Sequence, residues 1–351
     1  MPNSEQPFKI GITPDFYVDA KGRFESAVEQ LLGPAPNVDY GPMPGQPDKL
    51  ATADALNEFD GIFCLGLRIT PESLRGVERT AIVARWGVGY DRIDVGALTE
   101  ADILLAITPG AVKRPVAEAI LTLVFALSKN LVVQDRTARA GKWRGDLPGL
   151  GVDLPGRVLG SVGCGNIARE MFRLAGGLGF GRMIACDPYV RAAETAGLGV
   201  EIVDAETLYR ESDYVAVNTF LSDATRGLVG EAELRLMKPS AFLINTARGP
   251  IVDEEALVLA LREGWIKGAG LDVFEKEPPP AGHPLFGLDN VILAPHGLAW
   301  TEELVRDNGL EACRNLLAVA AGKAPDGIVN PEVLDRPGFR RKLNRFTGGA
   351  A

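Results

Sequence analysis

Three ionisable side chains, Arg248, Glu277 and His296, each stand shortly after an apolar run of the sequence. In an open α/β sheet, ligands bind beyond the carboxyl ends of the strands, so side chains at these places are candidates for chemistry. A histidine there can exchange the proton of a hydroxyl group, and an arginine can hold a carboxylate through two hydrogen bonds. A carboxylate bonded to the second imidazole nitrogen orients the ring and favours its protonated form. Together these groups provide what hydride transfer at the hydroxyl-bearing carbon of a 2-hydroxy acid requires.

Each of the three residues also has a simpler explanation when it is taken alone. Arg248 could cap a loop, Glu277 could be a solvated surface charge, and His296 could be a satisfied core histidine. Their ordered combination at successive strand ends favours the catalytic interpretation. The other histidine, His283, stands between a glycine and a proline and is predicted to be a loop residue.

A glycine-rich turn, residues 163–168, follows an apolar run and opens an amphipathic stretch. Two glycines permit a tight turn and close approach of a pyrophosphate, and the first N–H groups of the following helix attract its charge. Ala168 replaces the third glycine, which this fingerprint accepts. A purely structural turn is the alternative. The predicted cofactor contacts in this turn are Gly163, Gly165, Asn166 and Ile167.

Asp187 ends the next apolar run, 22 residues after Gly165. This spacing brings a carboxylate to the adenosine ribose, where it accepts hydrogen bonds from the hydroxyls and repels a 2′-phosphate. NAD is therefore expected, and NADP is the less favoured cofactor, although Arg191 lies nearby. A turn or helix-capping role before Pro188 is the alternative.

These residues need a framework of strands, and the sequence provides short β-rich runs that alternate with amphipathic stretches. A proline without an N–H fits the first turn of a helix, so a long helix is expected to begin at Pro115. The amphipathic stretch 302–321 lies beyond the last run and is expected to pack back on the first lobe. The expected strands are 8–13, 61–66 and 80–85 in a first sheet and 158–163, 183–187, 214–220, 241–247, 269–274 and 290–295 in a second.

The predicted fold is therefore α/β, with two doubly wound parallel-sheet lobes of the Rossmann-like kind, the first of them discontinuous. A substrate-binding and catalytic domain is expected over residues 1–113 and 302–340. A dinucleotide-binding domain is expected over residues 114–301.

The composition limits the classes of partner. The net charge of −9, without a cluster of Lys and Arg, argues against general binding to nucleic acids or to a membrane surface.

Residues 1–7 do not have the pattern of a signal peptide, so a cytoplasmic location is expected. The four cysteines, Cys64, Cys164, Cys186 and Cys313, are interpreted as core or loop residues, and no metal site is expected.

In combination, the motifs resemble those of the D-isomer-specific 2-hydroxyacid dehydrogenase family, and the resemblance covers most of the chain. Besides the glycine-rich turn, the matching segments are 87–91 with 93–94, 115–118, 141–143, 225–228, 245–249, 271–274, 277–278 and 295–296.

The resemblance implies an NAD-dependent D-2-hydroxyacid dehydrogenase, acting as a 2-oxo acid reductase, in which Arg248 binds the substrate carboxylate. It implies that Glu277 is the partner of His296, which is the acid/base. It also implies that N–H groups around Val88 and Gly89 help to hold the carboxylate, and that the protein is a homodimer. The cofactor contacts it adds are Thr219, Thr225, Thr246, Ala247, Asp272 and His296.

Two segments depart from the family pattern. Residues 218–221 read Asn-Thr-Phe-Leu where many relatives carry His-x-Pro-Leu, and residues 297–300 put Trp300 after the histidine. The leading alternative function is an NAD-sensing, corepressor-like binding protein on the same fold. Turnover of NADH with a small 2-oxo acid distinguishes the enzyme from this alternative.

Overall fold

The computed structural model describes residues 6–347, so the expectation that residues 1–7 lack a targeting signal falls mainly outside the described range. The chain forms two compact units, one that runs to Val112 and resumes at Thr301, and one from Lys113 to Trp300. The first unit thus draws on both ends of the chain, which confirms the discontinuous lobe.

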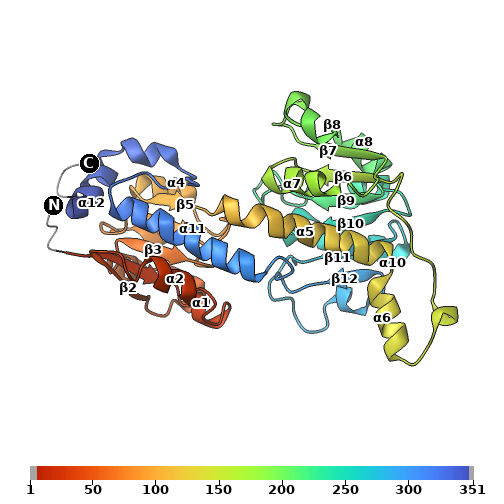
Figure 1. The fold of residues 1–351 in the computed structure, drawn as a ribbon, viewed down its shortest axis with the longest axis horizontal. Coiled ribbons are helices and arrows are strands. Elements are labelled where there is room, and N and C mark those ends of the chain that lie inside the picture. Colours follow the sequence, from red (N-terminus) through yellow and green to blue (C-terminus); the bar gives the residue numbers. More distant parts are fainter. Residues whose placement is uncertain (1–5, 348–351) are drawn as a thin grey trace. The chain divides into compact units, whose positions relative to one another are not determined.

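The first unit is built on a five-stranded sheet in which every strand pair is parallel. Helix α11 (Glu302–Ala320) packs against α2 (Glu25–Leu31) and the central strands, which joins the carboxyl-terminal segment to this sheet (Figure 1). The strand order is β2 (Val38–Pro42), β1 (Phe8–Ile12), β3 (Gly61–Cys64), β4 (Ile82–Arg85) and β5 (Leu104–Ala106). The other helices are α1 (Asp15–Val18), α3 (Ala53–Asn57), α4 (Val95–Glu100) and α12 (Pro337–Thr347).

The second unit is built on a seven-stranded parallel sheet covered by helices on both faces. The strand order is β12 (Val291–Leu293), β11 (Gly268–Leu271), β10 (Phe242–Asn245), β9 (Tyr214–Val217), β6 (Val158–Val162), β7 (Arg182–Cys186) and β8 (Val200–Ile202). The helices are α5 (Pro109–Ser128), α6 (Leu131–Arg139), α7 (Asn166–Ala175), α8 (Ala205–Glu211), α9 (Glu231–Leu236) and α10 (Glu254–Glu263).

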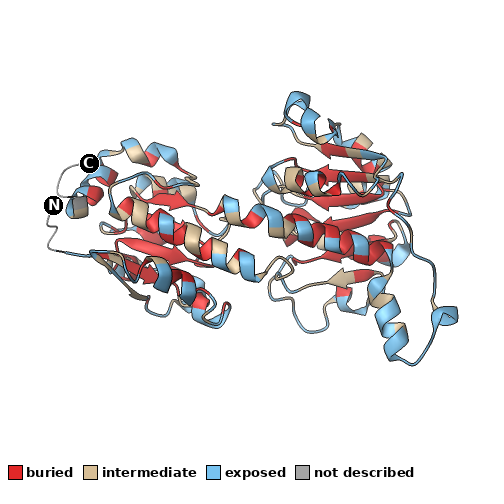
Figure 2. Ribbon diagram, in the orientation of Figure 1, coloured by how far each residue is buried: buried red, intermediate tan, exposed pale blue. Residues whose placement is uncertain are grey.

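Side-chain alternation along the strands explains why both faces of this sheet are covered. Val215 and Leu243 belong to the core beneath α8, α9 and α10, whereas Ala216 and Ile244 belong to the core beneath α5 and α7. Buried residues accordingly line the strands and the sheet-facing sides of the helices (Figure 2).

The candidate residues follow the carboxyl ends of the strands in each sheet. In the second unit the chain runs outward from β6 to β8 and then returns to β9, so the order reverses between β6 and β9. Ligands of doubly wound sheets bind at the carboxyl ends of strands beside such a reversal. In this unit, the residues considered below follow β6, β7, β9, β10, β11 and β12. In the first unit they follow β4.

Two expectations about the elements differ from the structure. The helix predicted to begin at Pro115 begins at Pro109, and Pro115 lies inside it. A proline fits the first turn at Pro109. Inside the helix, Pro115 lacks the N–H that would bond to the carbonyl of Ala111, and its ring crowds that carbonyl. The sequence pattern also does not predict β2, β5 and β8. All three are edge strands, and β5 and β8 are only three residues long.

None of the described helices is by itself long and apolar enough to cross a membrane. Helices α5 and α6 meet that measure only as a pair bent by 58°. The apolar side chains of α5 that raise its hydropathy, such as Ile120 and Val124, lie in the core of the second unit.

Candidate active site

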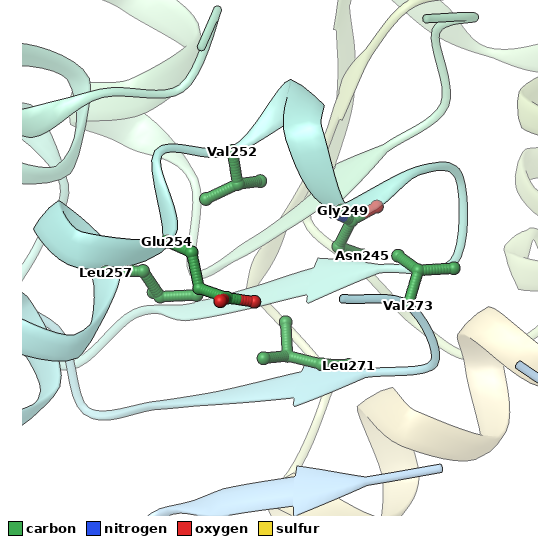
Figure 3. Close-up of a pocket in the computed structure, with 7 residues that line it drawn as sticks. All are labelled: Asn245, Gly249, Val252, Glu254, Leu257, Leu271 and Val273. Atoms are coloured by element: carbon green, nitrogen blue, oxygen red, sulfur yellow. The ribbon is translucent and has the colours of Figure 1, made fainter. Parts of the chain in front are cut away.

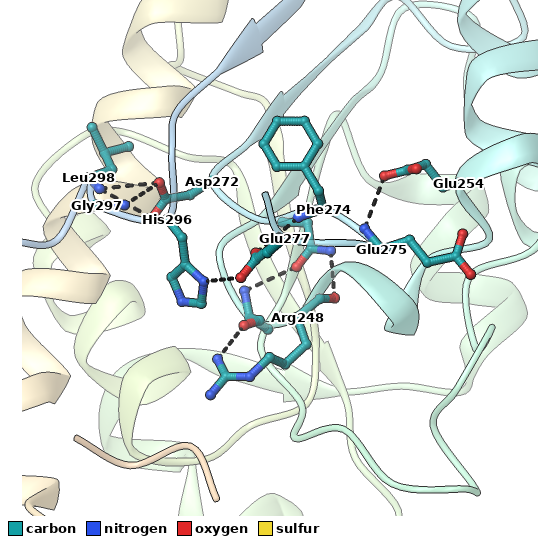
Figure 4. A network of polar contacts seen from close by, with 11 residues as sticks. Arg248, Glu254, Asp272, Phe274, Glu275, Glu277, His296, Gly297 and Leu298 are labelled. Atoms are coloured by element: carbon teal, nitrogen blue, oxygen red, sulfur yellow. Dashed lines mark hydrogen bonds and ion pairs between the residues drawn. The ribbon is translucent and has the colours of Figure 1, made fainter. Parts of the chain in front are cut away.

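The imidazole of His296 is paired with the carboxylate of Glu277. The distance from His296 Nδ1 to Glu277 Oε2 is 2.8 Å, and Glu277 Oε1 accepts a hydrogen bond from the N–H of Phe274 at 3.1 Å (Figure 4). Burial disfavours the charged form of Glu277, but the bond to His296, its charge, the Phe274 N–H and the charge of Arg248 outweigh burial, so the pKa of Glu277 is lowered. The carboxylate is therefore charged at neutral pH.

The backbone of His296 has a positive φ of 52°, in the left-handed region that few residues other than glycine adopt. Such conformations cost free energy and persist where surrounding contacts hold them, often at functional sites. The turn after His296 is held by Asp272, at the end of β11. Asp272 Oδ1 accepts hydrogen bonds from the N–H groups of Gly297 and Leu298 at 2.9 and 3.1 Å.

The carboxylate of Asp272 is buried, and burial raises its pKa against the opposing effects of the Leu298 and Gly297 N–H groups and of His296. Both of its oxygens contact N–H groups of the turn, since Oδ2 lies 3.2 Å from the nitrogen of Leu298. The structure thus gives Asp272 a clear task in shaping the turn at His296. The cofactor contact expected for it stays a prediction.

Arg248 stands at the turn after β10, and Asn245 shapes that turn. The side-chain amide of Asn245 donates to the carbonyl of Arg248 at 2.9 Å, and its oxygen accepts from the N–H of Ala247 at 3.0 Å. Arg248 itself donates through Nη1 to the carbonyl of Ala247 at 2.7 Å. Asn245 belongs to the matching segment 245–249, but the sequence predicts no separate role for it, although an asparagine two residues before a turn N–H is a known turn signal.

Gly249 lets the turn after β10 lie directly against the loop after β11. A Cβ atom on Gly249 would lie 1.9 Å from the carbonyl carbon of Phe274 and 2.4 Å from the nitrogen of Glu275, so no other residue fits there without a shift of the backbone. This contact brings Arg248 beside the loop that carries Glu277 (Figure 4). The structure therefore brings together the three residues for which the sequence predicts catalytic roles.

The glycine-rich turn has the shape that a pyrophosphate needs. Gly163 has a φ of 94°, and a Cβ atom there would lie 2.7 Å from the carbonyl oxygen of Asn218. Gly165 is the N-cap of α7, no side chain caps the first N–H groups of this helix, and nothing lies within 4 Å of the Cβ position of Gly165. These N–H groups, with Asn166 and Ile167 in the first turn, fit a dinucleotide phosphate.

Asp187 lies beside this turn at the end of β7. Its Oδ2 accepts from the N–H of Cys164 at 2.8 Å and its Oδ1 from the N–H of Tyr189 at 2.9 Å. These bonds fix the carboxylate next to the glycine-rich turn. Each oxygen can accept a second hydrogen bond, so the geometry is compatible with a ribose hydroxyl.

The other predicted cofactor contacts lie in the loops after β9 and β10. Thr219 follows β9 and lies against Gly163. The hydroxyl of Thr225 donates to the carbonyl of Phe220 at 2.6 Å, which closes a local turn. Thr246 Oγ1 is buried without a hydrogen-bond partner among the described residues, and Ala247 follows it in the Arg248 turn. Their contacts with a cofactor stay predictions.

Val88 and Gly89 lie in the loop after β4 of the first unit. Gly87, with a φ of 122°, donates to the hydroxyl of Thr108 at 2.8 Å, and Arg85 Nε donates to the carbonyl of Gly89 at 2.9 Å. Within residues 6–347, the N–H groups of Val88 and Gly89 donate to no protein acceptor. The hydrogen bonds of Gly87 and Arg85 thus fix this loop. The N–H groups of Val88 and Gly89 remain suited to bind a carboxylate.

Comparison with known proteins places the chain in a family. A family model described as D-isomer specific 2-hydroxyacid dehydrogenase, NAD binding domain, matches residues 121–297. A glyoxylate reductase of Korarchaeum cryptofilum is 39% identical over 300 residues, which cover 84% of this chain and 90% of that protein. A glyoxylate reductase of Aeropyrum pernix is 41% identical over 292 residues, which cover 80% of this chain and 87% of that protein.

The fold is also similar to that of solved structures. The crystal structure of a glyoxylate reductase from Paecilomyes thermophila matches with a TM-score of 0.79 and 29% identity, over 93% of this chain and 99% of the other. The chain therefore belongs to the D-isomer-specific 2-hydroxyacid dehydrogenase family and is an oxidoreductase with a nicotinamide-binding domain.

Proposed function

We propose that the protein is an NAD(H)-dependent D-2-hydroxyacid dehydrogenase that reduces a small 2-oxo acid to the 2-hydroxy acid, of D configuration where the product is chiral. Glyoxylate, whose product is achiral, is the first substrate to test. The observation that carries the proposal is the pair of His296 and Glu277 with Arg248 beside it. An acid/base and a carboxylate anchor at neighbouring strand ends match the needs of this reaction. The relatives named above as glyoxylate reductases support the choice of glyoxylate.

In the proposed reaction the bound nicotinamide supplies the hydride that reaches the 2-carbon. Arg248 holds the substrate carboxylate through two hydrogen bonds and so fixes which face of the 2-carbon is presented. His296 gives the proton from Nε2 to the carbonyl oxygen, which becomes the hydroxyl. Glu277, charged beside Nδ1, stabilises the imidazolium that donates this proton. Val88 and Gly89 are proposed as further carboxylate donors.

We infer that NAD is preferred to NADP because Asp187 lies beside the glycine-rich turn. A carboxylate at this place repels the 2′-phosphate of NADP and accepts hydrogen bonds from the ribose hydroxyls of NAD. The other proposed cofactor contacts are Gly163, Gly165, Asn166, Ile167, Thr219, Thr225, Thr246, Ala247, Asp272 and His296.

We propose that the protein is a homodimer formed through the second unit. Large apolar side chains are exposed on α6 and the segment after it, where Leu131, Trp143 and Leu150 are 58%, 74% and 85% exposed. Exposed apolar residues gathered on one segment are typical of protein interfaces. A second copy of the chain is the partner that the proposal requires.

A substrate panel with purified protein tests the proposed reaction. The panel pairs NADH with glyoxylate, hydroxypyruvate, phosphohydroxypyruvate and longer sugar-derived 2-oxo acids. Oxidation of NADH with a small 2-oxo acid and release of the 2-hydroxy acid are expected, and the product of hydroxypyruvate or a larger acid should have the D configuration. Tight binding of NADH without turnover of any acid would contradict the enzyme and favour an NAD-sensing binding protein.

A further inference from the structure

A second pair of a carboxylate and a histidine contacts the loop that carries Glu277. His283 Nε2 is 2.8 Å from Glu254 Oε1, and both side chains are largely buried. His283 Nδ1 accepts from the N–H of Leu285, so the neutral ring carries its proton on Nε2 and donates it to Glu254. The rings of Phe274 and Phe286 pack against the imidazole of His283 and limit its movement.

The other oxygen of Glu254 holds the backbone of the catalytic loop. Glu254 Oε2 accepts from the N–H of Glu275 at 3.1 Å, and the preceding N–H, of Phe274, donates to Glu277 (Figure 4). Two consecutive N–H groups are thus bound by two carboxylates. The position of Glu254 therefore fixes the backbone at Phe274 and Glu275, and the N–H of Phe274 in turn binds Glu277.

The surroundings of Glu254 strengthen this contact. Its carboxylate lies at a small hollow between α10 and the strands β10 and β11, lined by Val252, Leu257 and Leu271 (Figure 3). Hydrogen bonds to a charged group in apolar surroundings are stronger than those in water. Glu254 also stands at the first position of α10, where the helix favours a negative charge.

We propose that Glu254, oriented by His283, is a positioning residue that fixes the loop at Phe274 and Glu275 and thereby holds Glu277 against His296. This proposal rests on the proposed function, because it assigns Glu254 a task in that reaction. Within the second unit, the charged groups beside His296 are Glu277 and Asp272, and Arg248 acts on Glu277. Loss of Glu254 alters none of these side chains directly and acts only through the loop.

The kinetic test compares Glu254→Ala with Glu255→Ala in glyoxylate reduction. Glu255 is the exposed neighbour in the same helical turn, so its variant removes the same charge without the contact to Glu275. Glu254→Ala is expected to lower kcat about tenfold with unchanged KM for NADH, because small displacements of catalytic groups are costly. The pH above which kcat for glyoxylate reduction declines should also be lower in this variant. Glu254→Gln keeps an acceptor for the Glu275 N–H and should restore most of kcat.

A second measurement does not depend on activity. The chain contains only two histidines, so ¹⁵N-histidine-labelled protein gives one set of ring signals each for His283 and His296. In folded Glu254→Ala the titration of His296 should move to lower pH, and in Glu255→Ala it should not. An unchanged titration and kcat in Glu254→Ala would overturn the positioning role. If Glu277→Gln also leaves both unchanged, the proposed function itself fails.

Discussion

The backbone carbonyl of Arg248 accepts a hydrogen bond from Asn245, and one guanidinium nitrogen, Nη1, donates to the carbonyl of Ala247. An arginine placed in this way can present a planar fork to a carboxylate, which a lysine cannot match. Arg248→Ala is therefore expected to lower kcat/KM for glyoxylate about a hundredfold or more, in line with the loss of a bidentate charged contact.

The affinity for NADH should stay nearly unchanged in Arg248→Ala, because the side chain is assigned to the substrate. Fluorescence titration with NADH and steady-state kinetics give the two quantities separately. Arg248→Lys is the matched variant and should retain part of the activity. An ordinary KM for glyoxylate in Arg248→Ala would remove the carboxylate role.

Asp187 is fixed by two backbone N–H groups beside the glycine-rich turn. Asp187→Ala should raise kcat/KM with NADPH relative to NADH, because it removes a charge that repels the 2′-phosphate. The ratio of the two values in the wild type and the variant is the measurement. A wild-type preference for NADPH would show that Asp187 does not select the cofactor.

At the scale of elements, the site depends on the contact between the turn after β10 and the loop after β11. Gly249→Ala would place a methyl group 1.9 Å from the carbonyl carbon of Phe274, so the two segments must separate. The variant is expected to lose stability by about 1–3 kcal/mol, as overpacked sites do, and to lose most of its activity.

Gly197→Ala is the control for this change, because Gly197 is exposed and nothing lies within 4 Å of its Cβ position. Thermal unfolding and kcat should separate the two variants. If Gly249→Ala and Gly197→Ala have the same unfolding temperature and the same kcat, the close approach of Gly249 to Phe274 is not required for stability or activity.

The order and type of most elements follow from patterns within short segments. Each expected apolar run overlaps a strand, and the parallel strand order explains why residues after these runs gather at the carboxyl ends of the sheet. The start of α5 was misplaced because two prolines, Pro109 and Pro115, both carry a helix-start signal, and local sequence does not choose between them.

The sequence predicts a site residue where an ionisable side chain directly follows an apolar run, as it does at Arg248 and His296. The pairing of Glu254 with His283 was not predictable, because the two residues are 29 positions apart and meet only when α10 packs beside the loop after β11. Contacts of this kind depend on tertiary packing, which no local periodicity encodes.

At the scale of the whole molecule, the exposed apolar side chains at Leu131, Trp143 and Leu150 lead us to expect a dimer of about twice the chain mass of 37.4 kDa. Trp143→Asp puts a charge into the proposed interface and should shift the protein toward monomer in sedimentation experiments. Val18→Asp, at a residue 70% exposed in the first unit, is the control and should leave the mass unchanged. A wild-type monomer would contradict the proposed assembly.

The central claim is that His296, supported by Glu277, exchanges the proton of the reaction. Reduction needs the protonated ring, so kcat/KM declines as pH rises, and oxidation of the 2-hydroxy acid needs the neutral ring, so kcat/KM declines as pH falls. The lowered pKa of Glu277 keeps its carboxylate charged while the ring titrates, which stabilises the imidazolium.

The most direct test is therefore the pH dependence of kcat/KM in both directions for the wild type and Glu277→Gln, with His296→Ala as the reference for lost proton transfer. Glu277→Gln should move both declines to lower pH, and His296→Ala should reduce both directions about 10²–10⁴-fold. Unmoved profiles in Glu277→Gln, or full activity in His296→Ala, would contradict the proposed mechanism.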